Sequence, residues 1–186
     1  QAWKDTQVVG KLTKGVEMLL KKNKVEIIKG TAFFNEPQQL RVIDGNQSQT
    51  YTFKNAILAT GSRPIQIKGF PFGKRILDST GALNLKTLPK RLIFVGGGYI
   101  GSELAGIYAN LGTEVTIVEG TSSILPNFEA DMVKLVVNHF ENKGVRIITS
   151  AMAKQAIETD GGVSVTVEKD GQEEQLEADY VVVTVG

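Results

Sequence analysis

The stretch from Leu92 to Glu119, LIFVGGGYIGSELAGIYANLGTEVTIVE, decides how this chain folds. It has the pattern of a short apolar strand, a glycine turn, a helix and a second strand. Gly96, Gly98 and Gly101 form the spacing G-x-G-x-x-G. In this spacing the first glycine permits a tight turn, the second lets the backbone approach a pyrophosphate, and the third lets the helix pack against the strand. The helix that follows directs its dipole and its free N–H groups at the phosphates.

Glu119 closes the second strand 23 residues after Gly96. This is close to the ~20 residues at which an acid is expected to accept hydrogen bonds from the adenosine ribose. A carboxylate accepts a hydrogen bond from a free 2′-hydroxyl but repels a 2′-phosphate. The next residues are Gly120, Thr121 and Ser122, so no Arg or Lys directly follows. The pattern therefore predicts NAD(H) rather than NADP(H). The alternative is a glycine turn that packs two elements together without a ligand, and the strand, helix and acid around this turn argue against it.

The composition excludes several classes of protein. The 186 residues carry a net charge of +1, which gives no electrostatic footprint for nucleic acid or for a membrane surface. No apolar run approaches the ~18–20 residues that span a bilayer, and no secretory signal opens the chain. The sequence has no cysteine, and His139 is its one histidine, so we expect no metal site, disulfide framework or thiol nucleophile. We therefore expect a cytoplasmic chain without nucleic-acid or membrane partners.

The pattern that begins at Leu92 continues as one α/β domain. The amphipathic segment 129–143 predicts a second helix, and the apolar run 145–149 predicts a third parallel strand. Alternating segments joined by glycine turns predict three antiparallel strands, at 153–157, 163–168 and 173–176. A continuous apolar strand follows at 181–185. We expect a Rossmann-like dinucleotide-binding domain with a parallel sheet and an inserted antiparallel β-meander.

The first third of the chain predicts one helix followed by short strands. Val9, Leu12 and Val16 keep helical spacing within residues 1–23. The strands are predicted at 25–29, 31–34, 40–43, 50–53 and 56–59. The turn Asp44-Gly45-Asn46 predicts that the third and fourth of these strands pair as a hairpin.

A boundary between two domains is predicted in the segment 65–90. This segment is rich in proline and glycine and has little periodicity apart from a short predicted helix at 79–83. We therefore divide the chain into domains 1–66 and 67–186. A hairpin, a buried strand and a glycine recur near the end of each, which predicts that the first is a partial domain of the same kind as the second. Two such domains bind two dinucleotides, and the natural pair for electron transfer is a flavin and a nicotinamide.

Several motifs of the chain resemble those of the pyridine nucleotide–disulfide oxidoreductases. They are ATGSRP, VGGGYIGSELA, VTIVEG, ILPNFEADM and NKGVRIITSA, and they extend the resemblance over essentially the whole chain. Within the family, the sequence is most similar to the members that oxidise dihydrolipoamide. The resemblance implies NAD contacts at Gly96, Gly97, Gly98, Tyr99, Ile100, Gly101, Glu103, Glu119, Ala153 and Gly186. It implies FAD contacts at Gly30, Thr60, Gly61 and Ser62.

Two residues of the predicted helix resemble positions with a further role in the family. Ile100 resembles the residue that approaches the contact between flavin and nicotinamide. Glu103 resembles a carboxylate that pairs with a lysine near the flavin, and that lysine would precede residue 1. On the residues alone, Glu103 is equally an acid near a helix start that the helix dipole favours, so both interpretations stay open.

The chain departs from the family pattern in what it lacks. The redox-active cysteine pair, the first FAD-binding glycine motif and the His–Glu acid–base pair have no counterpart in the sequence. A helix at the first residue and a buried strand at the last suggest a segment of a longer protein. The resemblance implies that the intact protein passes electrons from dihydrolipoamide through a disulfide and FAD to NAD+, as a homodimer within a 2-oxoacid dehydrogenase complex. We expect the segment alone to be inactive.

Two alternatives stay open at this point. One is a segment of another FAD- and NAD(P)-dependent disulfide reductase, such as a mercuric or CoA-disulfide reductase, because the residues that discriminate these enzymes lie outside this sequence. The other is a stand-alone, non-enzymatic NAD-binding module, and the abrupt ends of the chain argue against that interpretation.

Overall fold

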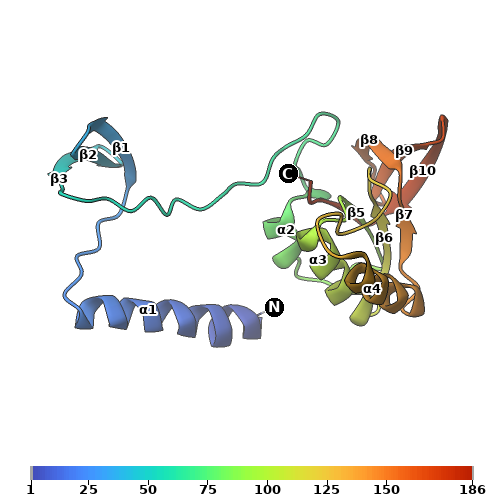
Figure 1. The fold of residues 1–186 in the computed structure, drawn as a ribbon, viewed down its shortest axis with the longest axis horizontal. Coiled ribbons are helices and arrows are strands. Elements are labelled where there is room, and N and C mark those ends of the chain that lie inside the picture. Colours follow the sequence, from blue (N-terminus) through green and yellow to red (C-terminus); the bar gives the residue numbers. More distant parts are fainter. Residues whose placement is uncertain (1, 186) are drawn as a thin grey trace. The chain divides into compact units, whose positions relative to one another are not determined.

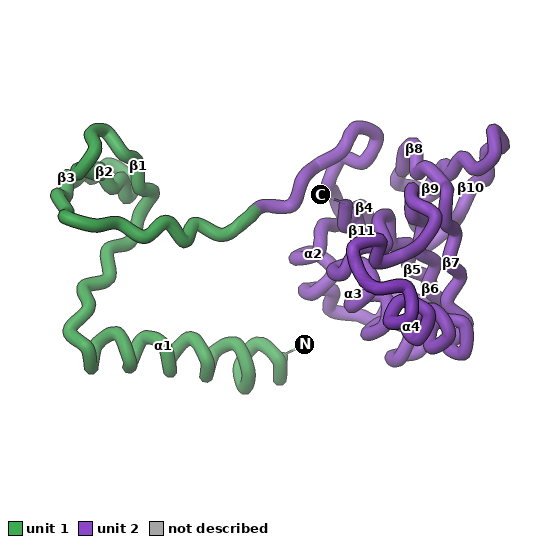
Figure 2. Tube along the Cα trace, in the orientation of Figure 1, with its two compact units in different colours: residues 1–62 green, residues 63–186 purple. Residues whose placement is uncertain are grey.

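The computed structural model describes residues 2–185, and its contacts divide the chain into two compact units. The first unit ends at Ser62 and the second begins at Arg63 (Figure 2). Among the described residues, none of the helices combines the length and the apolar character that crossing a bilayer requires.

The second unit is built on a sheet in which all neighbouring strands are parallel. Its strands, in spatial order, are β4 (Ile76–Leu77), β11 (Tyr180–Val183), β5 (Arg91–Val95), β6 (Glu114–Val118) and β7 (Arg146–Ile148). The helix α3 (Tyr99–Asn110) leads from β5 to β6, and α4 (Ala130–Asn142) leads from β6 to β7. A short helix, α2 (Ser79–Leu83), follows β4. The predicted Rossmann-like β-α-β-α-β unit is therefore confirmed.

The parallel sheet lies between two layers. Successive residues of a strand point to opposite faces, so each strand contributes side chains to both layers. In β5, Leu92 and Phe94 pack in one core with α3 and α4, whereas Ile93 and Val95 pack in a second core. The second core is completed by the strands β8 (Ala151–Glu158), β9 (Val163–Lys169) and β10 (Gln172–Ala178). Figure 1 shows the helices on one side of the sheet and β8–β10 on the other. The apolar side chains of β5 are at most 4% exposed, as its continuous apolar run predicts.

The strands β8, β9 and β10 form the predicted antiparallel meander. In the sequence they lie between β7 and β11. After the meander, the chain re-enters the parallel sheet as β11, which pairs with β5 on the side opposite β6. A bulge interrupts the pairing of β8 with β9 between Ala153 and Gln155. The Gly69 carbonyl accepts the N–H of Ala156 close to this bulge, at 2.9 Å.

The first unit contains a helix and an antiparallel sheet. A segment with π-helical hydrogen bonding, η1 (Lys4–Val9), leads into α1 (Gly10–Lys22). The strands β1 (Thr31–Glu36), β2 (Gln39–Asp44) and β3 (Gln47–Thr52) follow. Asp44 pairs with Gln47 at the end of the β2–β3 hairpin, which confirms the predicted turn at Gly45-Asn46. Within residues 2–62 no side chain is fully buried.

Two of the strands predicted for the first unit are absent. Residues 25–29 and 56–59 are not paired in any sheet of the described chain. Ile57 is 94% exposed and Leu58 is 71% exposed, so the apolar segment AILA has no core to enter. A buried strand needs neighbouring strands and covering layers on both faces, and the antiparallel β1–β3 sheet supplies neither. The sequence prediction was wrong because it depended on partners that residues 2–62 do not contain.

Candidate nucleotide-binding site

The glycine turn of the second unit lies at the carboxyl end of β5. The chain leaves β5 and passes through α3 to β6 on one side, while β11 lies on the other side. The order of the strands therefore reverses at β5. In open α/β sheets, ligands bind outside the carboxyl ends of the strands at such a topological switch point. The glycine turn for which dinucleotide binding is predicted lies at this position.

Gly96 and Gly101 are required by close packing around the turn. Gly96 has φ +105°, and a Cβ there would lie 2.9 Å from Cγ1 of Val185. A Cβ on Gly101 would overlap the carbonyl oxygen of Gly96 and would lie 2.7 Å from Oγ1 of Thr184. The first glycine thus permits the turn and the third permits the helix to approach the strand, as their spacing predicts.

Gly98 differs from its neighbours because it faces open space. A Cβ on Gly98 would meet no atom of the described chain within 4 Å. Gly98 is the N-cap of α3, and its carbonyl accepts the first helical hydrogen bond, from the N–H of Ser102 at 2.9 Å. The N–H groups of residues 99–101 precede that bond and have no partner inside the helix. With no acidic residue in the first turn of α3, these groups and the helix dipole form a site that suits a phosphate.

Gly97 is tied to its surroundings through both of its backbone groups. Its N–H donates to Oε2 of Glu119 at 2.6 Å. Its carbonyl accepts from the N–H of Leu125 at 2.8 Å and from the hydroxyl of Ser102 at 3.1 Å. A Cβ on Gly97 would lie 2.7 Å from Cγ2 of Ile124. Gly97 is therefore a structural link between the turn and the loop after β6, and its N–H is already satisfied.

Glu119 reaches back from the end of β6 to the glycine turn. In addition to the Gly97 bond, its Oε1 accepts from the N–H of Thr121 at 2.8 Å and from the hydroxyl of Thr121 at 2.9 Å. A carboxylate has about four acceptor positions, so three protein donors leave room for a further hydroxyl. The structure thus brings the predicted acid and the predicted glycine turn together. The sequence did not reveal Thr121 as the residue that holds this acid.

The start of β8 lies beside Glu119. The carbonyl of Glu119 accepts from the N–H of Ala151 at 3.1 Å, and the carbonyl of Thr121 accepts from the N–H of Ser150 at 2.8 Å. Ala153, a predicted NAD contact, is half-buried two residues further along β8, next to the bulge. Gly186, the other predicted contact in this part of the chain, lies outside the described residues.

Thr184 supports the turn from the end of β11 and was also missed in the sequence. Its hydroxyl lies 2.8 Å from the carbonyl of Gly96 and 3.1 Å from that of Val95, and its N–H donates to Val95 at 2.8 Å. Thr184 lies 88 residues from Gly96 in the sequence, so local patterns gave no signal for this contact.

Ile100 and Glu103 lie on the part of α3 that borders α2. Together with residues of α2 they line an open depression of about 540 Å³, whose walls are Ser79, Leu83, Ile100, Glu103, Leu104 and Ile107. Glu103 is exposed and Ile100 is half-buried. Tyr99, at the first position of α3, is 64% exposed. The roles predicted for these three residues by resemblance stay predictions.

The predicted FAD contacts all lie in the first unit. Gly30 has φ +139°, and a Cβ there would lie 2.6 Å from the carbonyl oxygen of Ile43, so packing against β2 accounts for this glycine. Thr60, Gly61 and Ser62 are exposed and belong to no helix or strand. Gly61 has φ +69° with open space around it. The FAD role of these four residues stays a prediction.

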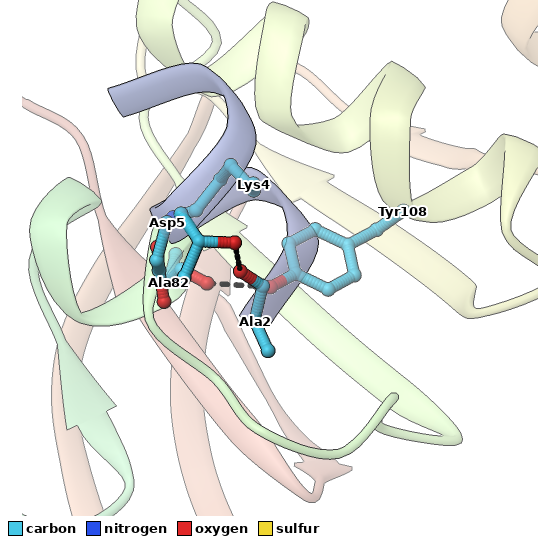
Figure 3. Close-up of polar contacts among 6 residues, drawn as sticks. Ala2, Lys4, Asp5, Ala82 and Tyr108 are labelled. Carbon is cyan, nitrogen blue, oxygen red and sulfur yellow. Dashed lines mark hydrogen bonds and ion pairs between the residues drawn. The ribbon is translucent and has the colours of Figure 1, made fainter. Parts of the chain in front are cut away.

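Two polar side chains, Tyr108 and Asp179, connect the elements that carry the glycine turn. The hydroxyl of Tyr108 on α3 donates to the carbonyl of Ala82 on α2 at 2.6 Å (Figure 3), and burial raises the pKa of this phenol. Before β5, Oδ2 of Asp179 accepts from the N–H of Arg91 at 3.0 Å and from the N–H of Lys90 at 2.6 Å. These hydrogen bonds lower the pKa of Asp179 despite partial desolvation, and the bond from Arg91 has the largest effect.

Among residues 2–185 no cluster of three or more His, Cys, Asp or Glu side chains could hold a metal ion.

Comparison with known proteins gives close relatives. Dihydrolipoyl dehydrogenases from Staphylococcus aureus, Geobacillus stearothermophilus and Bacillus subtilis are 60%, 56% and 54% identical to the chain over 97–100% of its length. The chain spans only 39–40% of the length of these relatives.

Two solved structures share the fold, the first of them a flavoprotein disulfide reductase. The Cu(II) complex of a mutant of RclA from Escherichia coli matches with a TM-score of 0.86 and 30% identity, over 98% of this chain and 41% of that one. LpdA from Mycobacterium tuberculosis matches with a TM-score of 0.85 and 26% identity, over 97% of this chain and 40% of that one. The family model described as pyridine nucleotide-disulphide oxidoreductase matches residues 2–186. The chain belongs to the pyridine nucleotide-disulphide oxidoreductase family.

Proposed function

We propose that the second unit binds NAD(H) at the glycine turn and prefers it to NADP(H). The observation that carries this proposal is the environment of Gly98. A Cβ there would meet nothing within 4 Å, whereas Cβ atoms on Gly96, Gly97 and Gly101 would each meet protein atoms. Among the four glycines of the turn, only Gly98 therefore leaves an open backbone approach, and it lies at the N-terminus of α3, where a pyrophosphate is stabilised.

Glu119 supports the choice of cofactor. Its carboxylate is fixed beside the turn and retains acceptor capacity for a ribose hydroxyl, whereas its negative charge opposes a 2′-phosphate. When bound, the nicotinamide supplies hydride transfer. The chain's own residues bind and orient the cofactor: residues 98–101 at the pyrophosphate, Glu119 at the ribose, and Ile100, Ala153 and Gly186 at further contacts that the family resemblance suggests.

We propose further that the chain serves as a segment of a dihydrolipoyl dehydrogenase. The identities of 54–60% to dihydrolipoyl dehydrogenases support this choice over RclA, at 30% identity. In this proposal, residues 1–66 belong to an FAD-binding domain, with Gly30 and Thr60–Ser62 as FAD contacts, and Glu103 lies near the flavin. A homodimer within a cytoplasmic 2-oxoacid dehydrogenase complex belongs to the same proposal. The sequence contains no cysteine, so the chain by itself should not oxidise dihydrolipoamide.

Titration of the 186-residue chain with NADH, NADPH and FAD tests the proposal. Calorimetry should detect weak binding of NADH, NADPH binding at least tenfold weaker, and no tight binding of FAD. A Glu119→Gln variant should reduce the preference for NADH over NADPH because the charge that opposes a 2′-phosphate is removed. A preference for NADPH, no binding of NADH, or lipoamide-dependent turnover by the chain alone would each contradict a stated part of the proposal.

A further inference from the structure

The carboxylate of Glu119 is held by a neighbour two residues along the chain. Thr121 donates to Oε1 through both its N–H, at 2.8 Å, and its hydroxyl, at 2.9 Å. Gly97 donates to the other oxygen at 2.6 Å. Hydrogen bonds to an ionised acceptor are roughly twice as strong as neutral ones. Both carboxylate oxygens therefore have a fixed position before any ligand arrives.

Thr121 is itself anchored through its backbone, and its hydroxyl has a second acceptor nearby. Its carbonyl accepts the N–H of Ser150 at 2.8 Å, which anchors the backbone to the start of β8. Its hydroxyl also lies 2.8 Å from the carbonyl of Ser123. A hydroxyl has one proton and two acceptor positions, so it can donate to Glu119 or to Ser123 but not fully to both. The charged carboxylate is the stronger acceptor, so the proton is directed to Glu119, and the Ser123 carbonyl is a competing acceptor rather than a second anchor.

A glutamate side chain is otherwise costly to hold in one conformation. Ordering a long polar side chain costs up to about 1.5–2 kcal/mol of conformational entropy. If the side chain is already ordered in the free protein, this cost no longer lowers the affinity for the ligand. Glu119 is only half-buried, so packing alone does not fix its carboxylate. The hydrogen bonds from Thr121 and Gly97 are the contacts that do so.

From these contacts we infer that Thr121 is a positioning residue for the nucleotide ribose. It acts through Glu119: its hydroxyl orients the carboxylate toward the position that the ribose 2′-hydroxyl occupies, and it contributes no charge of its own. This inference rests on the proposed NAD(H) site. It goes beyond that proposal because it assigns a role to a residue outside the glycine turn and the acid.

The inference is tested by removing the hydroxyl while keeping the shape of the side chain. In the 186-residue chain, Thr121→Val should weaken binding of NADH and of ADP about three- to tenfold, whereas Thr121→Ser should bind as the unchanged chain does. Thr159→Val, in the exposed turn between β8 and β9, is a matched control and should change nothing. The melting temperature of each variant shows whether it is folded.

A probe without the 2′-hydroxyl separates positioning from general damage. Binding of 2′-deoxy-ADP should be nearly insensitive to Thr121→Val, because the hydrogen bond that Glu119 makes is already missing from that ligand. In a Glu119→Ala background, Thr121→Val should cause no further loss for ADP. Equal affinity of the Thr121→Val variant and the unchanged chain for ADP would overturn the role of Thr121 and leave the NAD(H) site intact. Failure of the unchanged chain to bind NADH or ADP would instead overturn the site itself.

Discussion

Gly98 and Gly101 lie one turn apart, and a methyl group added to each should have opposite consequences. At Gly98 the added Cβ meets nothing, so Gly98→Ala should cost no more than about 1 kcal/mol of unfolding free energy, chiefly because alanine is a poorer N-cap than glycine. The methyl group would project into the space proposed for the pyrophosphate, so NADH binding should weaken at least tenfold. Thermal unfolding and NADH titration of the same sample separate these two effects.

Gly101→Ala is the matched comparison. Its Cβ would overlap the carbonyl of Gly96, which the Thr184 hydroxyl holds in place. Overpacking of this kind should cost about 1–3 kcal/mol and outweigh the gain in helix propensity from alanine. A stable Gly101→Ala variant, or a Gly98→Ala variant with unchanged NADH affinity, would contradict these assignments.

Asp179 should make stability depend on pH. Because its pKa is lowered by the Arg91 and Lys90 N–H groups, the ionised form contributes stability above the ordinary aspartate pKa of about 3.9. That contribution is lost as the pH falls through the lower pKa of the folded state. The carboxylate is partly solvated, so Asp179→Asn should cost only about 0.5–1 kcal/mol at pH 7. Urea unfolding at pH 7 and pH 3 should show the difference shrinking at the lower pH, and a constant difference would argue against this account.

Residues that act by local geometry could be recognised in the sequence, whereas residues that act across the fold could not. The roles of Gly96 and Gly101 followed from their spacing, and Glu119 followed from its distance to them. Thr121 is an exception: it lies only two residues after Glu119, a spacing at which side chains and backbone often exchange hydrogen bonds, but its contact with the acid was not predicted. Thr184 gave no signal, because only the parallel pairing of β11 with β5 brings it to the turn.

The helices α2 and α3 are joined by a buried hydrogen bond. Tyr108→Phe would remove the phenol donor from the carbonyl of Ala82, which keeps the N–H of Leu85 at 3.3 Å, and should lower the free energy of unfolding by about 0.5–1.5 kcal/mol. Burial raises the pKa of Tyr108, so the contribution is fully present below about pH 10 and is lost as the pH rises through the folded-state value. Denaturant unfolding measures the cost.

Tyr99→Phe provides the control for this element. Tyr99 is also on α3 but is 64% exposed, so the loss of its hydroxyl should leave the unfolding midpoint unchanged. Equal stability of the Tyr108→Phe variant and the unchanged chain would show that water or another donor replaces the phenol.

Elements were predictable where their partners are part of the chain. The apolar run of β5 has parallel neighbours on both sides and layers on both faces, and it forms the predicted strand. The run at 56–59 has the same character in sequence but no such neighbours within residues 2–62, and it remains unpaired. A sequence pattern reports the tendency of a segment to be buried, and the rest of the molecule decides whether a core is available.

The two units of the molecule differ in how their apolar residues are used. The second unit has two cores formed by its own residues, whereas no residue within 2–62 is fully buried. A chain of residues 63–186 should therefore fold by itself and bind NADH within about twofold of the full chain. Thermal unfolding and NADH titration of both chains test this expectation. A shorter chain that fails to unfold cooperatively would show that the second unit depends on the first.

The place of β11 in the sheet determines when the glycine turn after β5 gains its last supporting contact during synthesis. The hydroxyl of Thr184 comes from a residue 88 positions after the Gly96 carbonyl that it contacts. At a translation rate of roughly 5–20 residues per second, that separation corresponds to roughly 4–18 s. Throughout this interval one edge of β5 lacks its partner and is open to mispairing and to capture by chaperones. A nascent chain thus carries an unsupported glycine turn until β11 has left the ribosome.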